Sequence, residues 1–244
     1  MPAPTGHVIY RGPSLLDGAP IIAVAITRSS NRKTGNMVQT YTLREDIKPT
    51  AAVASGADVS ICGDCKHRPA LGGACYVVVC QGPTVVWKAY TRGRYPDALN
   101  CGAIASLAIG RNVRLGTYGD PAAVPAYVWH ALLTHAAGHT GYTHQWAGAG
   151  SAQYLRGIVM ASADSPAERI DAAALGWRTF RVMAAGDIPG PREFTCPASV
   201  EAGHRKQCHE CKACDGAARG TGQASPVIVV HGSKASRFAL TLTA

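Results

Sequence analysis

Four cysteines near the C-terminus constrain this chain more than any other feature. Cys208, Cys211 and Cys214 are spaced C-x2-C-x2-C in the segment QCHECKACDG. Cys196, followed by Pro197, lies upstream. Each two-residue step lets the backbone curl around one inorganic centre and direct successive sulfurs inward, while a remote cysteine supplies the fourth ligand. The spacing therefore predicts a metal site that acts chiefly through folding stability.

This ligand set resembles that of ferredoxin-type proteins, which hold a [4Fe–4S] cluster with closely spaced cysteines and a remote cysteine followed by proline. Zinc is the alternative, because a four-cysteine zinc site also arranges its thiolates tetrahedrally. Zinc ribbons more often present two separated C-x2-C pairs, whereas here three thiols lie within seven residues. The pattern favours an iron–sulfur cluster and leaves zinc as the competing cofactor.

A second cysteine group consists of Cys62, Cys65 and Cys75. The C-x2-C pair is typical of a metal-binding turn, and the third cysteine is close enough in sequence to join it. Three thiolates with no fourth protein ligand suit a reactive cluster, because the remaining iron can take substrate or cofactor. A zinc site of three cysteines and His67 is the alternative.

Cys80 and Cys101 are further candidates for the fourth ligand of this group. Both lie among apolar residues, so we expect them to be buried thiols that pack as small hydrophobic side chains. The N-terminal residues lack the apolar stretch of a signal peptide, and no apolar run reaches membrane-spanning length. We therefore expect a cytoplasmic protein outside any membrane, in which clustered thiols are metal ligands rather than disulfides.

Strand and helix patterns alternate along most of the chain. We expect strands at 20–27, 37–43, 59–62, 76–80, 112–120, 140–146, 157–162, 177–183 and 226–232, and helices at 83–93, 121–137, from 151, and 165–176. Repeated strand–helix–strand units predict a parallel sheet with right-handed crossovers. We predict an α/β fold built on a partial or closed β/α (TIM-like) barrel, with a doubly wound sheet as the alternative.

The same pattern divides the chain into three parts. Residues 1–55 form a β-rich N-terminal segment, and residues 56–195 form the barrel-like core with the first cysteines. Residues 196–244 form a cysteine-rich metal-binding segment with a final strand. At 47% hydrophobic residues, a chain of 244 residues can bury a core of that size.

The turn GTYGDP (116–121) follows an expected strand, at the end where ligands bind in parallel α/β folds. In its order of elements, the region 56–215 resembles the radical S-adenosylmethionine enzymes. These are partial β/α barrels with a three-cysteine loop after the first barrel strand and a Gly-Gly-Glu-Pro turn after the second. The resemblance implies a cluster on the first cysteines, S-adenosylmethionine as cofactor, Gly119 and Asp120 in its pocket, and an auxiliary cluster on the C-terminal cysteines.

One departure from the family pattern and one simpler explanation of the turn accompany this resemblance. The family loop is usually C-x3-C-x2-C, whereas this chain has C-x2-C-x9-C. Asp120 and Pro121 also have a simpler explanation, because Asp at the N-cap and Pro at the first helical position are common helix starters.

The histidine of GYTHQW, His144, is the best further candidate for the cofactor pocket, because it lies near the C-terminal end of an expected strand. A metal-dependent nuclease site at His144 is an additional interpretation. The same motif, together with Cys75-Tyr76, resembles uncharacterised cysteine-rich bacteriophage proteins. That resemblance implies a phage origin and the cytoplasm of a bacterial host.

The formal charge of +9, from 24 Lys and Arg against 15 Asp and Glu, favours an anionic partner such as nucleic acid or a phosphorylated small molecule. Solubility alone is the competing explanation. We therefore expect a cluster-dependent enzyme that acts on a nucleic-acid-related or other anionic substrate. The alternative is a nucleic-acid-binding module, stabilised by zinc or a cluster, without catalysis.

Overall fold

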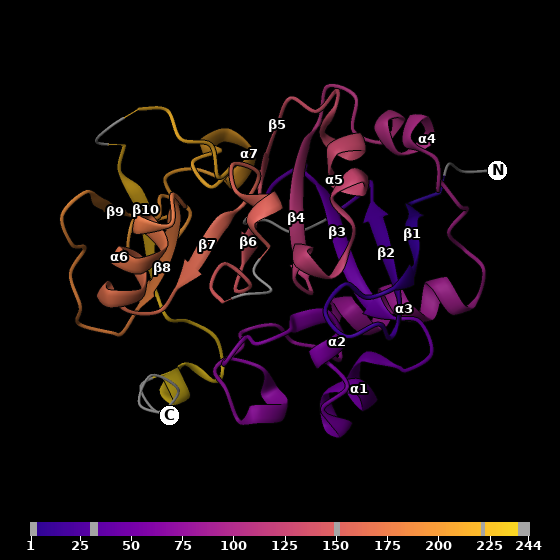
Figure 1. The fold of residues 1–244 in the computed structure, drawn as a ribbon, viewed down its shortest axis with the longest axis horizontal. Coiled ribbons are helices and arrows are strands. Elements are labelled where there is room, and N and C mark those ends of the chain that lie inside the picture. Colours follow the sequence, from indigo (N-terminus) through magenta and orange to yellow (C-terminus); the bar gives the residue numbers. More distant parts are fainter. Residues whose placement is uncertain (1–3, 30–33, 149–151, 221–222, 239–244) are drawn as a thin grey trace.

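The computed structural model describes residues 4–29, 34–148, 152–220 and 223–238. It is an α/β protein with two five-stranded sheets that lie side by side (Figure 1). Most strand pairs are parallel, as the alternating pattern predicts. The described strands form no closed barrel.

The first sheet combines antiparallel and parallel pairing. Its order is β1 (Gly6–Pro13), β2 (Pro20–Ile26), β3 (Val38–Arg44), β4 (Asn112–Tyr118) and β5 (Gly138–Thr140). The pairs β1–β2 and β2–β3 are antiparallel, and the pairs from β3 to β5 are parallel. The apolar run of β2 is buried on both faces, as expected for an inner strand.

The second sheet is parallel throughout. Its order is β6 (Tyr142–Thr143), β7 (Met160–Ala163), β8 (Thr179–Met183), β10 (Ser225–Val229) and β9 (Glu193–Thr195). Only Gly141 separates β5 from β6, so the chain passes from one sheet to the other at this residue. A Cβ atom there would come within 2.7 Å of Val159 and 2.9 Å of Leu115, so the crossing point has no room for a side chain.

The helices are short and connect the strands. They are α1 (Pro49–Ser55), α2 (Val59–Cys62), α3 (Gly82–Thr91), α4 (Cys101–Ser106), α5 (Ala126–Leu133), α6 (Pro166–Ala174) and α7 (Cys208–Cys211). Single 3-10 turns are η1 (Pro69–Leu71), η2 (Pro121–Ala123), η3 (Gln153–Leu155) and η4 (Ala235–Arg237). The predicted start of α6 is confirmed, because the Ser165 hydroxyl accepts the Glu168 N–H at 3.1 Å.

Three expected elements differ from the structure. The segment 59–62 is helical rather than extended, because the Ile61 and Cys62 N–H groups bond back to the Asp58 carbonyl. The segment 76–80 forms no strand. The helix expected at 121–137 is divided into η2 and α5, and Pro125, which has no N–H to donate, occupies the N-cap of α5.

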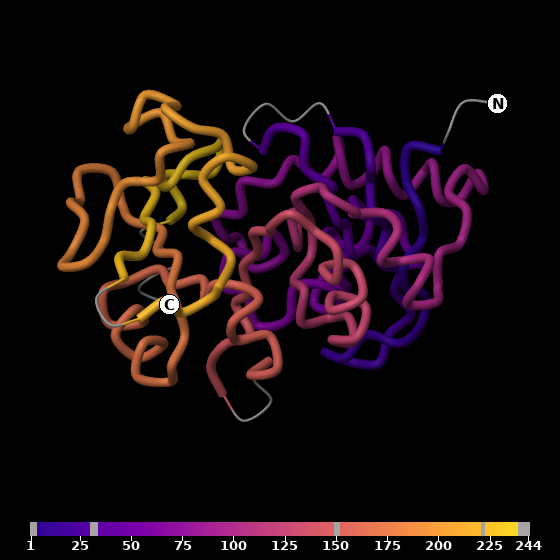
Figure 2. Tube along the Cα trace, turned by 90° about the horizontal axis from the view of Figure 1, so that it is seen from above, coloured from indigo at the N-terminus to yellow at the C-terminus, as the bar shows by residue number. Residues whose placement is uncertain are grey.

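Strand pairing continues across the expected segment boundaries. The N-terminal strand β3 pairs with β4, and the C-terminal strand β10 lies between β8 and β9. Figure 2, from above, shows the C-terminal part of the chain in the half of the molecule formed by the second sheet. One apolar core, with the fully buried Trp129 in it, joins residues of both halves.

Candidate metal and cofactor site

A cavity of about 570 Å³ lies between the two sheets. Strands of both sheets line it: Arg114, Gly116, Thr117 and Tyr118 on β4, and Phe180 and Val182 on β8. The cavity is therefore bounded by strands of both sheets.

The cavity brings together the residues that the sequence marks as ligands. Those lining it are Cys62, Cys65, Cys75, Gly119, Asp120, His144, Cys196, Cys208, Cys211 and Cys214. The two cysteine groups, more than 100 residues apart in sequence, thus face one space. The expectation that Cys80 and Cys101 are buried is wrong. Both are exposed, because one lies in the turn before α3 and the other begins α4.

A half-buried arginine, Arg68, holds the loop of the first cysteine group. The Arg68 guanidinium donates to Asp58 Oδ1 at 2.8 and 3.2 Å, and to the carbonyl oxygens of Gly56 and Gly63 at 2.9 and 3.3 Å. The Cys75 N–H bonds to the His67 carbonyl at 3.0 Å. The loop around the three thiols is therefore fixed by the protein itself.

The ends of β4 and β6 are attached to this loop. The Asp120 N–H donates to the Ile61 carbonyl at 2.6 Å, directly before the first cysteine. The Gln145 side chain bonds to the Cys62 carbonyl at 3.2 Å and to the Asp64 N–H at 3.3 Å. The GYTHQW motif thus positions the cysteine turn.

Gly119 has a conformation and a location that favour glycine. Its φ is +76°, and a Cβ atom would lie 2.8 Å from the Thr42 Cβ and 2.9 Å from the Thr42 carbonyl oxygen. The turn from β4 can therefore pass close to β3 while it follows the cavity wall.

The Asp120 carboxylate is used within the protein. Its Oδ1 accepts from the Ala122 N–H at 2.9 Å and the Thr143 hydroxyl at 2.7 Å, and its Oδ2 accepts from the His144 N–H at 2.8 Å. Burial raises the pKa of this carboxyl, and these hydrogen bonds oppose the increase. The simpler explanation from sequence, a cap of the following helical turn, is confirmed for its side chain.

The pKa of each thiol in the first group is raised above its usual value. Burial raises the pKa of Cys65 to about 12, and burial together with the other two thiols raises the pKa of Cys62 well above its usual value. The His67 and Val77 N–H groups donate to the sulfurs of Cys65 and Cys75, which lowers the pKa of each thiol in part. A metal bound here would displace thiol protons and meet prepared sulfur ligands.

A separate group of ligand atoms lies beside these thiols. One atom each of His67, His144 and Asp164 lies within 4.8 Å of the other two. His67 Nε2 is 2.8 Å from Asp164 Oδ2, so the histidine expected as the fourth zinc ligand is directed to Asp164. Burial tends to raise the pKa of Asp164, but His67, His144 and Lys66 outweigh it and keep that pKa below the usual value.

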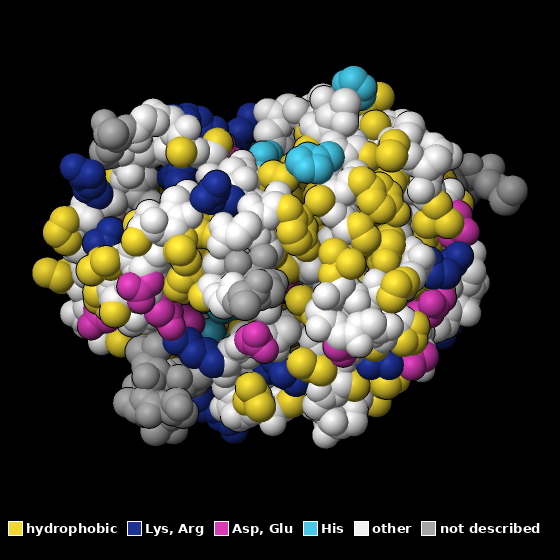
Figure 3. Space-filling view, viewed as in Figure 1, with side chains coloured by type: hydrophobic (Ala, Val, Ile, Leu, Met, Phe, Trp, Pro, Cys, Tyr) yellow, Lys and Arg dark blue, Asp and Glu magenta, His cyan; other side chains and the backbone are white. Residues whose placement is uncertain are grey.

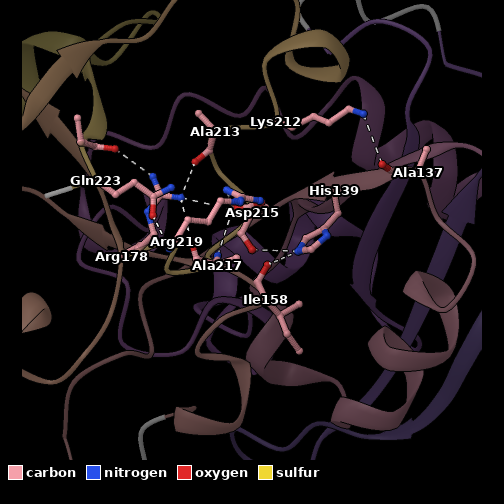
Figure 4. A network of polar contacts seen from close by, with 11 residues as sticks. Ala137, His139, Ile158, Arg178, Lys212, Ala213, Asp215, Ala217, Arg219 and Gln223 are labelled. Atoms are coloured by element: carbon pink, nitrogen blue, oxygen red, sulfur yellow. Dashed lines mark hydrogen bonds and ion pairs between the residues drawn. The ribbon is translucent and has the colours of Figure 1, made fainter. Parts of the chain in front are cut away.

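A polar network holds the segment that carries Cys214 (Figure 4). The Arg178 guanidinium donates to the Ala213 carbonyl at 3.0 Å and to Asp215 Oδ1 at 3.4 Å. His139 Nε2 lies 3.0 Å from the Asp215 carbonyl oxygen, and the Gly141 N–H donates to the Cys214 carbonyl at 3.0 Å. The C-terminal thiols are thus tied to the strands.

The Cys214 thiol has a side-chain hydroxyl as its hydrogen-bond partner, whereas the Cys65 and Cys75 sulfurs have backbone N–H groups. The Tyr142 hydroxyl hydrogen-bonds to this thiol, and the Arg114 guanidinium donates to the same hydroxyl at 3.3 Å. Arg114 is buried, stacks 4.5 Å from the Tyr142 ring centroid, and has no carboxylate within ion-pair distance among the described residues. Burial raises the pKa of Cys214 to about 12. A buried cation without a counter-ion suits negative charge in the cavity.

The described cysteine sulfurs are not gathered tightly enough for a single ion. No three of them lie within 4.8 Å of one another, whereas Zn–S bonds of about 2.3 Å place tetrahedral thiolates roughly 3.8 Å apart. In a four-iron cluster each thiolate binds a different iron, so its sulfurs lie farther apart. None of the described cysteines stands in a clear arrangement for binding a cluster either.

The surface charge on the face shown in Figure 3 does not mark a binding surface. On the face shown in Figure 3, Lys and Arg side chains are dispersed among acidic and apolar ones and form no single patch. None of the described helices combines the length and apolarity needed to cross a membrane.

Sequence reasoning missed four residues of this site: Asp164, Arg114, Tyr142 and Arg68. Asp164 follows a buried parallel strand directly, a position that the rule for ligand binding at carboxyl ends could have identified. The charge of Arg114 within an apolar strand was a second overlooked signal. No protein-family model, curated protein or solved structure matches this chain.

Proposed function

We propose that this chain is a cluster-dependent enzyme of the radical S-adenosylmethionine type, with the cavity between the sheets as its reaction chamber. The observation that carries the proposal is that both cysteine groups line that one cavity together with Gly119 and Asp120. A protein that used metal only for folding would need neither a shared cavity nor two metal groups facing it. When bound, a cluster and S-adenosylmethionine supply one-electron radical chemistry.

The order of elements supports this function. The first cysteine group follows β3, and the Gly119–Asp120 turn follows the neighbouring parallel strand β4. With β5 and β6 taken as one strand that crosses at Gly141, the parallel strands from β3 to β10 enclose the cavity on one face. We interpret this arrangement as an open β/α barrel whose strand ends carry the site.

Each cysteine group has a role that follows from its surroundings. The first offers three thiols, and His67 is directed elsewhere, so one iron of a cluster there is left for the cofactor. Asp120 positions the turn and the backbone of His144, while Gly119 leaves its wall free of a side chain. The C-terminal group has four thiols of its own and would hold a structural or electron-relay cluster.

The substrate that this cavity favours is anionic. Arg114 and Lys212 line it, and Arg114 is buried without a carboxylate partner among the described residues. A phosphorylated or nucleic-acid-derived molecule fits that charge.

Anaerobic purification tests the proposal. We expect a brown protein with iron and acid-labile sulfide, and a change in the electron paramagnetic resonance signal of the reduced protein when S-adenosylmethionine is added. Cys65→Ser should abolish that change and remove one cluster, Cys211→Ser should lower thermal stability, and the exposed Cys101→Ser is the matched control. Colourless protein with stoichiometric zinc, or no response to S-adenosylmethionine, would contradict the proposal.

A further inference from the structure

Three side chains converge at one end of the cavity from three parts of the chain. His67 belongs to the loop of the first cysteine group, His144 follows β6, and Asp164 follows β7. The strands β6 and β7 are parallel neighbours with Thr143 opposite Ala161, so the residues after them lie side by side. One ligand atom of each of the three side chains is within 4.8 Å of the other two.

Two of these side chains are buried, and each has one polar atom without a partner among the described residues. His67 is 8% exposed and Asp164 is 3% exposed. His67 Nδ1 and Asp164 Oδ1 have no hydrogen-bond partner among the described residues, whereas His67 Nε2 and Asp164 Oδ2 form an ion pair 2.8 Å apart. Unsatisfied buried polar atoms are unfavourable, and an ion between them would remove the penalty.

The surrounding residues hold the three ligands in place. The Phe238 ring stacks on His67 with centroids 5.4 Å apart, and the Asp120 carboxylate fixes the backbone of His144. Lys66 lies 3.5 Å from Asp164 Oδ2 and donates to Glu168 at 2.6 Å. Outer contacts of this kind orient metal ligands and maintain affinity.

We propose that His67, His144 and Asp164 bind one divalent first-row transition-metal ion, separate from the metal of either cysteine group. Two imidazoles and one carboxylate leave coordination positions open, as in the facial triads that hold iron(II). His67 and His144 line the cavity, so the open positions face it and can take a water molecule or an oxygen donor of a substrate. No cysteine contributes, so the site stands independently of the function proposed above.

Manganese(II) is the probe that tests the site, because carboxylate and imidazole ligands accept it and soft thiolates select other metals. Titration of the full chain, followed by the electron paramagnetic resonance of free manganese(II), should show one bound ion. Asp164→Asn should weaken binding at least tenfold. The exposed Asp171→Asn should leave it unchanged.

Cys65→Ser and Cys211→Ser should also retain the bound manganese(II), which distinguishes this site from the cysteine groups. The proposal is overturned when no ion binds, or when Asp164→Asn binds as tightly as the unmutated chain. If Asp164→Asn does not fold, the manganese(II) complex of the unmutated chain provides the test. Its electron spin-echo signal should show modulation by two imidazole nitrogens, and the lack of that modulation rejects the site.

Discussion

The two walls of the cavity hold their cysteines by different means. In the wall around Cys65, backbone N–H groups donate to the sulfurs, and the His67–His144–Asp164 group lies alongside. In the wall around Cys214, the sulfur is met by the hydroxyl of Tyr142, which the buried Arg114 supports. The first wall places thiols beside the side chains of His67, His144 and Asp164, whereas the second surrounds thiols with donors that stabilise negative charge. Under the function proposed above, the first wall would carry the chemistry and the second would control charge.

Both walls depend on buried arginine–carboxylate pairs. Arg68 and Asp58 hold the first cysteine loop, with side-chain exposures of 11% and 1%. Arg181 and Glu193 hold the start of the C-terminal segment, with exposures of 4% and 1%. Removal of one member of such a pair leaves a charge buried and unpaired, so each wall can be weakened separately.

The largest effect is expected for Arg68→Met. The change leaves the Asp58 carboxylate buried without its partner and frees two backbone carbonyls, so the free energy of unfolding should fall by about 3–5 kcal/mol. Chemical denaturation measures this loss. If both cysteine groups bind metal as proposed, metal analysis should show depletion of the first group alone. The exposed Arg92→Met is the control. Equal metal loss from both groups would show that the walls are not independent.

A smaller, pH-dependent effect is expected for Glu193→Gln. Burial tends to raise the pKa of Glu193, but hydrogen bonds from Arg181 and Gly190 outweigh it and hold the pKa below the usual 4.5. A lowered carboxyl pKa stabilises the fold above the unfolded pKa, and that contribution is lost as the pH falls through the folded pKa.

We therefore expect Glu193→Gln to cost about 2 kcal/mol at neutral pH. The difference from the unmutated chain should shrink as the pH falls below 4.5. Denaturant titrations at a series of pH values measure it, with the exposed Asp171→Asn as control. A difference that does not change with pH would assign the effect to packing rather than to charge.

The smallest effect is expected for Tyr142→Phe, which removes only the hydroxyl that bonds to Cys214. Stability should fall by about 1 kcal/mol. If the C-terminal cysteines hold the cluster proposed above, its reduction potential should become more negative, because a donor to the sulfur favours the reduced, more negative form. A redox titration followed by electron paramagnetic resonance measures this, with the first group as internal reference. If the reduction potential of the first group shifts instead, Tyr142 acts on that group and not on the C-terminal one.

The sequence predicted those features that depend on residues only a few positions apart. The division of the cysteines into two groups follows from their spacing, and the start of α6 follows from Ser165 and Pro166, because these effects act over a few residues. Parallel pairing was also predictable from the alternation of elements.

The remaining features depend on contacts between distant residues. That both cysteine groups face one cavity, or that His67 meets Asp164, depends on which strands become neighbours. The segment VSIC looks extended by composition, but it is helical because of its bonds to Asp58. Arg114 could be recognised as unusual in its strand, yet its partner Tyr142 belongs to another sheet.

The stacking of Phe238 on His67 has a consequence for the timing of assembly. Phe238 is 2% exposed, lines the cavity, and lies 74 residues after Asp164 in the chain. At about 5–20 residues per second, synthesis from the N-terminus completes the two histidines and the aspartate roughly 4–15 s before this ring emerges. We expect the nascent chain to pass through a period in which the three proposed ligands, His67, His144 and Asp164, are accessible to ions from solution. The Phe238 ring then covers His67.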